Sequence, residues 1–304
     1  MSFIPAFCVE DFHDYRMFFK DISSEHLICN SPVFWDPISR HAISDQVNKG
    51  AKIQVFQHGG GYDLQLYDSW HRLEKKFADQ WVGWRNSLNS TNIITKESLM
   101  LFEQKTLKEK TSLGSKELRN DVLIIGPFFK KVHSYNLSMH PFYNQCVAEK
   151  LNLLIKTLEE KNFSVRYRPY GWREDEVSIL RGKRLGPVTS IYDDIQSSKI
   201  IICSKTTTAV NDCLACKRIP LLFFDFEENL NEFAIKKLDA LRQYKLYFSE
   251  PNELAENLLM NKDYNLHATE PAILKLYDQL FGIGIASKEV FLSRILAFIN
   301  TKKR

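Results

Sequence analysis

The second half of the chain alternates apolar segments with helical segments, and this alternation restricts the possible folds more than any other feature. Four short apolar segments are typical of buried strands: 121–129, 163–170, 200–204 and 219–226. Three segments between them have the polar and apolar spacing of helices: 140–161, 188–199 and 206–218. Strands joined by crossover helices run parallel, so this half is predicted to form a doubly wound α/β sheet that binds ligands at the carboxyl ends of its strands.

The first half has the same kinds of element in a less regular order. A helical segment ends at Gly50, an apolar strand follows at 51–57, and a polar helix comes after it. A charged stretch without aromatic residues then separates the two apolar halves, and 304 residues suffice for two hydrophobic cores. We therefore predict an N-terminal domain at 1–103, a linker at 104–120 and a C-terminal domain at 121–304.

Composition narrows the class of protein. With 44% hydrophobic and 26% charged residues, the chain is typical of soluble globular proteins. Its net charge of +4 is too small to indicate a nucleic-acid partner, although it suits an anionic ligand. The N-terminus carries acidic residues where a signal peptide has basic ones, and no apolar run approaches the roughly 18 residues of a membrane span. We therefore expect a cytoplasmic protein.

The six cysteines have neither the spacing of a disulfide framework nor that of a zinc site. Cys213 and Cys216 form a C-x-x-C pair, but it lies within a helical segment, and the chain has no second pair to complete tetrahedral coordination. We predict buried free thiols and no bound metal.

A cluster of hydroxyl groups follows the strand at 200–204. Ser204, Thr206, Thr207 and Thr208 surround Lys205 at the expected start of a helix. The N-terminus of a helix presents unpaired backbone N–H groups and a partial positive charge, so this stretch is suited to bind a phosphate. N-capping of the helix is the simpler explanation, but one hydroxyl suffices for a cap.

A histidine and three glycines follow the strand at 51–57, in the sequence QHGGGY. No G-x-S-x-G elbow and no P-loop occurs in the chain, so neither a hydrolase nor a P-loop assignment explains His58 and its glycines. At a strand end beside an unobstructed backbone, His58 is placed to take a proton from a sugar hydroxyl or another alcohol. A histidine that only bonds the loop is the alternative.

Several motifs together resemble a known family. QHGGGY, LEKKFADQWVGW, RYRPYGW and IPLLFF occur in the order found in transferases of bacterial O-antigen and surface-polysaccharide loci. Those proteins are similar to GT-B glycosyltransferases and, at a distance, to the Kdo transferases that use a CMP-activated donor. The resemblance implies an α/β, GT-B-like fold with two Rossmann-like domains and parallel sheets, the first of them incomplete here. The chain has Asp63 where the family usually has glycine, and Asp212 where it usually has glutamate.

The resemblance and the residues together imply a glycosyltransferase that moves a sugar from a CMP-linked donor to a surface-polysaccharide or lipid-linked acceptor, without a cofactor. We expect no nucleic-acid partner and a place at the inner face of the cytoplasmic membrane. The predicted catalytic residues are His58, Asp63 and Glu74. The predicted donor-binding residues are Gly59, Gly60, Arg168, Tyr170, Ser204, Thr206, Thr207, Thr208 and Asp212. Asp79 is a further carboxylate near His58 in sequence, and Glu74 lies in a charged run for which solvent exposure is the simpler expectation.

Two other functions fit the same residues. The stretch from Ser204 to Glu228 also resembles transferases of polyol phosphate of the CDP-glycerol type, which have a GT-B-like fold, an HG loop and a hydroxyl-rich helix start. A catalytically inactive protein that binds a sugar nucleotide or a polysaccharide is the third possibility, suggested by the short N-terminal half.

Overall fold

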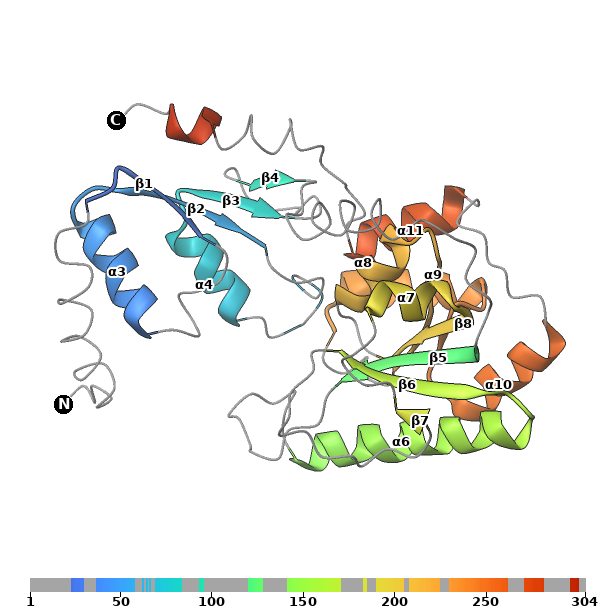
Figure 1. Ribbon diagram of the computed structural model, residues 1–304. Coiled ribbons are helices and arrows are strands. Elements are labelled where there is room, and N and C mark those ends of the chain that lie inside the picture. The colour runs from blue at the N-terminus through green and yellow to red at the C-terminus, as the bar shows by residue number, and fades with distance from the viewer. Residues whose placement is uncertain are drawn as a thin grey trace. The chain divides into compact units, whose positions relative to one another are not determined.

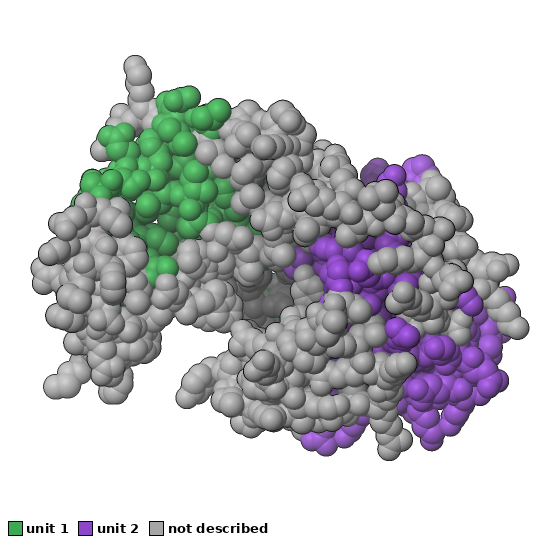
Figure 2. Space-filling view, in the orientation of Figure 1, with its two compact units in different colours: residues 1–103, 282–304 green, residues 104–281 purple. Residues whose placement is uncertain are grey.

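The structure of the protein is a computed structural model. It describes residues 23–29, 37–57, 62, 64, 66, 69–83, 93–95, 120–127, 141–170, 183–184, 190–204, 208–224, 230–261, 271–281 and 296–300. The chain divides into two compact units, one made of residues 1–103 with 282–304 and the other of residues 104–281 (Figure 2).

The first unit contains a parallel sheet with helices packed against it (Figure 1). Its described strands, in sheet order, are β1 (His26–Cys29), β2 (Lys52–Phe56), β3 (Gln80–Gly83) and β4 (Ile93–Thr95). Its helices among the described residues are α3 (Pro37–Asn48) and α4 (Ser69–Phe77). Ile53, Val55 and Trp81 form a buried core on one face of the sheet, packed against Ile43 of α3 and Phe77 of α4.

The turn after α3 confirms the helix end predicted at Gly50. Gly50 has a φ of +91°, a left-handed conformation that favours glycine, and its N–H donates to the Val47 carbonyl. The chain enters β2 two residues later. A strand therefore follows the helix after a short turn, as the sequence indicated.

The end of the chain groups with the first unit, whereas the sequence analysis assigned residues 282–304 to the C-terminal domain. A helical stretch at 296–299 packs here through Phe298, which is 3% exposed. The Phe298 ring meets the His26 imidazole of β1 edge-on, with ring centroids 5.2 Å apart. This tertiary contact leaves no trace in the local sequence pattern.

The second unit is a doubly wound α/β sheet, as predicted. Its described strands, in sheet order, are β10 (Tyr247–Phe248), β9 (Leu221–Phe223), β8 (Ser198–Cys203), β5 (Asn120–Pro127), β6 (Val165–Tyr170) and β7 (Lys183–Arg184). Each described pair of neighbouring strands runs parallel. The described helices are α6 (Pro141–Glu160), α7 (Ile191–Gln196), α8 (Thr208–Ala215), α9 (Glu232–Gln243), α10 (Pro251–Met260) and α11 (Pro271–Phe281). Figure 1 shows α6 and α10 on one face of the sheet and α7, α8, α9 and α11 on the other.

The strand order creates a topological switch point between β5 and β8. From β5 the chain builds outward through β6 and β7, then returns to the other side of β5 to form β8, β9 and β10. In open α/β sheets, ligands bind in the crevice outside the carboxyl ends of the strands at such a point. The crevice at the ends of β5 and β8 is therefore the place to look for a binding site in this unit.

Candidate functional site

Residues from β5, β6 and the end of β8 pack closely together at the carboxyl edge of the sheet, beside the switch point. Gly126 lies near the end of β5, and a Cβ atom on it would lie 2.6 Å from the Ser204 Oγ and 2.7 Å from the Tyr167 Cε2. Both distances are too short for a carbon atom, so only glycine fits between Ser204 after β8 and Tyr167 of β6. Glycine at this position therefore lets the Tyr167 ring and the Ser204 hydroxyl pack against the end of β5.

Ser204 and Thr208 frame the connection from β8 to α8. The Ser204 N–H donates to the Ile125 carbonyl at 2.9 Å, which extends the sheet by one residue, and the side chain is 2% exposed. Thr208 begins α8 and is 8% exposed. Lys205, Thr206 and Thr207, predicted to bind the donor phosphate, lie outside the described residues. The start of α8, with the positive end of its helix dipole, thus lies at the switch point.

Asp212 lies one turn further along α8 than Thr208, on the same face of that helix. Its side chain is 2% exposed, and one carboxylate oxygen accepts a hydrogen bond from the Tyr192 hydroxyl of α7 at 3.3 Å. The contact joins α8 to the neighbouring helix.

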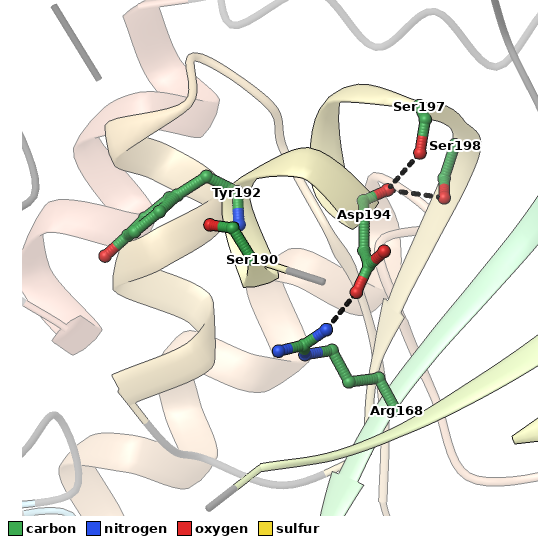
Figure 3. A network of polar contacts seen from close by, with 6 residues as sticks. All are labelled: Arg168, Ser190, Tyr192, Asp194, Ser197 and Ser198. Atoms are coloured by element: carbon green, nitrogen blue, oxygen red, sulfur yellow. Dashed lines mark hydrogen bonds and ion pairs between the residues drawn. The ribbon is translucent and has the colours of Figure 1, made fainter. Parts of the chain in front are cut away.

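Arg168, which the sequence analysis placed near the donor, forms an ion pair with the Asp194 carboxylate of α7 (Figure 3). The two side chains are 14% and 6% exposed, so the pair is shielded from water. In the sheet, Arg168 of β6 lies beside Ile125 of β5, and Ile125 is the residue before Gly126. Its guanidinium group has a partner within the protein, and the charge is balanced without a ligand. Tyr170, the other predicted residue of this strand, pairs with Pro127 at the end of β6.

Segment 188–199 is not one continuous helix as the sequence predicted. Helix α7 spans Ile191–Gln196, and β8 already begins at Ser198. The hydroxyls of Ser197 and Ser198 donate to the Asp194 carbonyl at 3.3 and 2.7 Å, as Figure 3 shows. These side chains satisfy a carbonyl at the helix end, which allows the chain to turn into the strand.

The C-x-x-C pair is buried behind the site. Cys213 and Cys216 are 0% and 4% exposed, and the Cys213 Sγ lies 4.0 Å from the Cys203 Sγ. Burial raises the pKa of the Cys213 thiol well above its usual range, and the neighbouring Cys203 and Asp212 add to the shift. A protonated thiol is a poor nucleophile and a poor metal ligand. Within the part of the chain that the structure describes, no group of histidine, cysteine and carboxylate side chains is arranged to hold a metal ion.

In the first unit, the residues on either side of the histidine and glycines are fixed. The Gln57 N–H donates to the Val82 carbonyl at 2.9 Å, and the Gln57 side chain is 5% exposed. Tyr62 is 2% exposed and stacks on Trp81 with ring centroids 5.5 Å apart. His58, Gly59, Gly60 and Asp63 lie outside the described residues. The QHGGGY and DQWVGW motifs are therefore connected by the stacking of one aromatic residue from each.

Glu74 is buried, so the expectation that it lies in solvent is wrong. Its side chain is 1% exposed on α4, and one carboxylate oxygen accepts a hydrogen bond from the Tyr62 hydroxyl at 3.0 Å. Burial raises the pKa of the Cys29 thiol to about 12, and the Glu74 charge contributes to the shift. Asp79 has a structural contact, because its carboxylate accepts from the Ile53 N–H at 2.7 Å.

Sequence reasoning missed four residues around the switch point: Gly126, Tyr167, Tyr192 and Asp194. A signal existed for Gly126, because Gly126 and Pro127 together mark the end of an apolar strand, where glycine allows close approach. The other three act through contacts with residues between 20 and 26 positions away or across the sheet, and no local pattern predicts such pairs.

The parallel α/β architecture is that of the GT-B fold. The solved structure of the spinosyn forosaminyltransferase SpnP is similar over 96% of this chain and 80% of that one, with a TM-score of 0.51 and 9% sequence identity. The MurG structure from Acinetobacter baumannii matches over 95% and 77% (TM-score 0.49, 10% identity), and the wall teichoic acid polymerase TagF over 83% and 69% (TM-score 0.41, 13% identity). At these identities the likeness concerns the fold alone.

The family follows from the sequence. The model of the LIC12162 family transferases matches residues 1–263, and the chain belongs to this transferase family. No curated protein sequence matches the chain. None of the described helices is long and apolar enough to cross a membrane.

Proposed function

We propose that the chain transfers a sugar from a CMP-linked donor to a surface-polysaccharide or lipid-linked acceptor. The observation that carries this proposal is the convergence of Gly126, Ser204 and the start of α8 at the switch point of the second unit. A strand end at a topological switch point beside a helix N-terminus suits a phosphate, and membership of a transferase family supports a phosphate that belongs to an activated donor.

The second unit holds the donor in this proposal. The start of α8 and the Thr208 hydroxyl bind the phosphate in this proposal, together with Lys205, Thr206 and Thr207, whereas the Ser204 hydroxyl donates to the Ile125 carbonyl within the sheet. A helix N-terminus contributes about 0.3–1 kcal/mol to binding an anion, so hydroxyls and a lysine are needed for useful affinity.

The first unit supplies the base. His58 takes the proton of the acceptor hydroxyl, with Gly59 and Gly60 leaving room for the ligand and Asp63 as the nearest carboxylate in sequence. Glu74 fixes Tyr62, which follows the glycines in sequence, because its carboxylate accepts a hydrogen bond from the Tyr62 hydroxyl at 3.0 Å. A positioned base of this kind contributes about 10²–10⁴ in rate.

A thermal-shift panel of nucleoside mono- and diphosphates tests the donor. We expect cytidine nucleotides to raise the melting temperature, because a ligand at 100 times its Kd adds about 2.7 kcal/mol of stability. Thr208→Ala should weaken the shift. The matched control is Thr157→Ala, which removes a buried hydroxyl from α6 of the same unit and should leave the shift intact. A response to uridine or guanosine nucleotides alone would reject the donor assignment.

We place the protein at the inner face of the cytoplasmic membrane, where a lipid-linked acceptor is available. Leu296 and Ile299 are 57% and 44% exposed on the helical stretch that carries Phe298, and Lys302, Lys303 and Arg304 follow in sequence. Aliphatic side chains beside basic ones suit an anionic lipid surface. Cosedimentation with phosphatidylglycerol vesicles should occur at low salt and weaken in a Leu296→Ser, Ile299→Ser variant; no binding to such vesicles would contradict this placement.

A further inference from the structure

Helix α7 lies beside the proposed nucleotide site, and several polar contacts join it to its neighbours. It has six residues, all of them described, and Ile195 is the one aliphatic side chain among them that is fully buried. A helix this short is not stable by itself, so its place in the fold depends on its tertiary contacts. Loss of one polar contact should therefore shift α7 more than it would shift a long amphipathic helix.

Two of these contacts join α7 to the sheet. The Asp194 carboxylate pairs with Arg168 near the carboxyl end of β6, and the Asp194 carbonyl accepts from Ser198 at the start of β8 (Figure 3). The Ser190 hydroxyl also accepts from the Tyr192 N–H at 3.3 Å and caps the first turn. Helix α7 is thus tied to the strands on either side of β5, the strand that carries Gly126.

A third contact joins α7 to α8. The Tyr192 ring points away from Asp194 in Figure 3, and its hydroxyl donates to the Asp212 carboxylate. Asp212 shares a helix face with Thr208, four residues earlier, where the proposed phosphate site begins. The position of Tyr192 therefore bears on the orientation of the first turn of α8.

We propose that α7 positions the nucleotide site. Arg168 and Asp194 fix α7 on the sheet, and Tyr192 extends that constraint to Asp212 and the start of α8. Arg168 is in this view a positioning residue that acts through α7. The effect on affinity rests on the proposed nucleotide-binding function, whereas the effect on α8 itself does not.

Tyr192→Phe tests the proposal because it removes one hydroxyl and keeps the ring. The lost bond is long for a hydroxyl donor at 3.3 Å, so we expect the Kd for CMP, measured by calorimetry, to rise by about fivefold, below the full effect of a hydrogen bond to a charged group. The control is Tyr277→Phe, which removes a buried hydroxyl that donates to the Pro220 carbonyl at 2.5 Å, at the amino end of β9. It should lower the melting temperature and leave the Kd unchanged.

Hydrogen exchange supplies a readout that needs no ligand. In Tyr192→Phe we expect faster exchange of the backbone amides of 208–215, and in Tyr277→Phe we expect none in that segment beyond the global change in stability. Unchanged exchange in α8 together with an unchanged Kd would overturn the proposal. If no cytidine nucleotide binds the native protein while α8 still exchanges faster in Tyr192→Phe, the proposed donor is wrong and the positioning role of α7 stands.

Discussion

At the scale of single residues, Gly126 is a position where the structure leaves no room for a side chain. An alanine there would place its Cβ 2.6 Å from the Ser204 Oγ and 2.7 Å from the Tyr167 ring. Both neighbours are buried, at 2% and 3% exposed, so neither has free space to move into. We expect Gly126→Ala to destabilise the second unit by about 1–3 kcal/mol, as overpacking of a tight core does.

Chemical denaturation measures this effect, and Ser204→Gly provides the internal check. Because it removes the closest atom, the double variant should recover part of the lost stability. Gly50→Ala is the contrasting control: nothing lies within 4 Å of its Cβ position, so any cost there comes from the φ of +91° alone. A Gly126→Ala protein as stable as the native one would show that the sheet edge is not tightly packed.

The thiols allow a prediction about pH. The pKa of Cys29 is raised to about 12, so at pH 9 about one Cys29 thiol in 10³ is ionised. We expect iodoacetamide to modify the exposed Cys146 at pH 8 to 9, as seen by peptide mass spectrometry, while the half-buried Cys29 reacts far more slowly in the native protein than after unfolding. Alkylation of Cys29 in the native protein as fast as that of Cys146 would contradict its raised pKa.

The same shift has a definite sign for stability. A thiol whose folded pKa is raised stabilises the fold in its neutral form, so the contribution is fully present below its unfolded pKa near 9. It is lost as the pH rises through about 12. Between about pH 9 and pH 12, the free energy of unfolding should therefore fall less in Cys29→Ala than in the native protein.

At the scale of secondary-structure elements, the sequence predicted those that are long or strongly periodic. The helix at α6 and the strands β5, β6, β8 and β9 lie where apolar spacing placed them. Strands β7 and β10 have two residues each, too few to show a period, and the start of β8 was hidden by two serines that also suit a helix. Ser197 and Ser198 do not continue the helix, because their hydroxyls donate hydrogen bonds to the Asp194 carbonyl at its end.

The ion pair that holds α7 is an element-scale feature with a measurable cost. Arg168→Ala leaves the Asp194 carboxylate buried without its cation, and we expect a loss of about 3 kcal/mol or more in urea denaturation. The surface pair of Lys236 and Glu232 on α9 is the control, because both side chains are exposed and Lys236→Ala should change stability very little. Equal, small effects of the two substitutions would show that the Arg168 pair is screened by water.

At the scale of the whole molecule, the sequence places the predicted ligand-binding residues at strand ends but does not specify how the two units are arranged. The sequence shows a hydroxyl-rich helix start directly after a strand. The structure places these residues, Ser204 and Thr208, at the end of β8 and the start of α8. Strand and helix patterns specify each sheet separately and carry no information about the arrangement of two sheets. We predict that the strand ends at Phe56 and Ile202 face one cleft, and an experimental structure with bound nucleotide tests this prediction.

Loss of His58 should separate catalysis from nucleotide binding. His58 directly follows Gln57, which is fixed in the sheet, and four positions later Tyr62 is fixed again by Glu74 and Trp81. A base must lie within about 3 Å of the hydroxyl that it deprotonates, so a glycine-flanked histidine between two fixed residues is well suited to the task. We expect His58→Ala to lower turnover by about 10²-fold or more, with little change in the Kd for the nucleotide.

His71→Ala is the comparison for this experiment, because His71 lies within α4 and has no glycine beside it. It should reduce turnover far less than His58→Ala. Normal turnover in His58→Ala would make the glycine loop a structural feature. Loss of nucleotide binding in His58→Ala at an unchanged melting temperature would instead assign His58 to the donor, because a general base for the acceptor touches the hydroxyl and leaves the binding energy of the nucleotide unaltered.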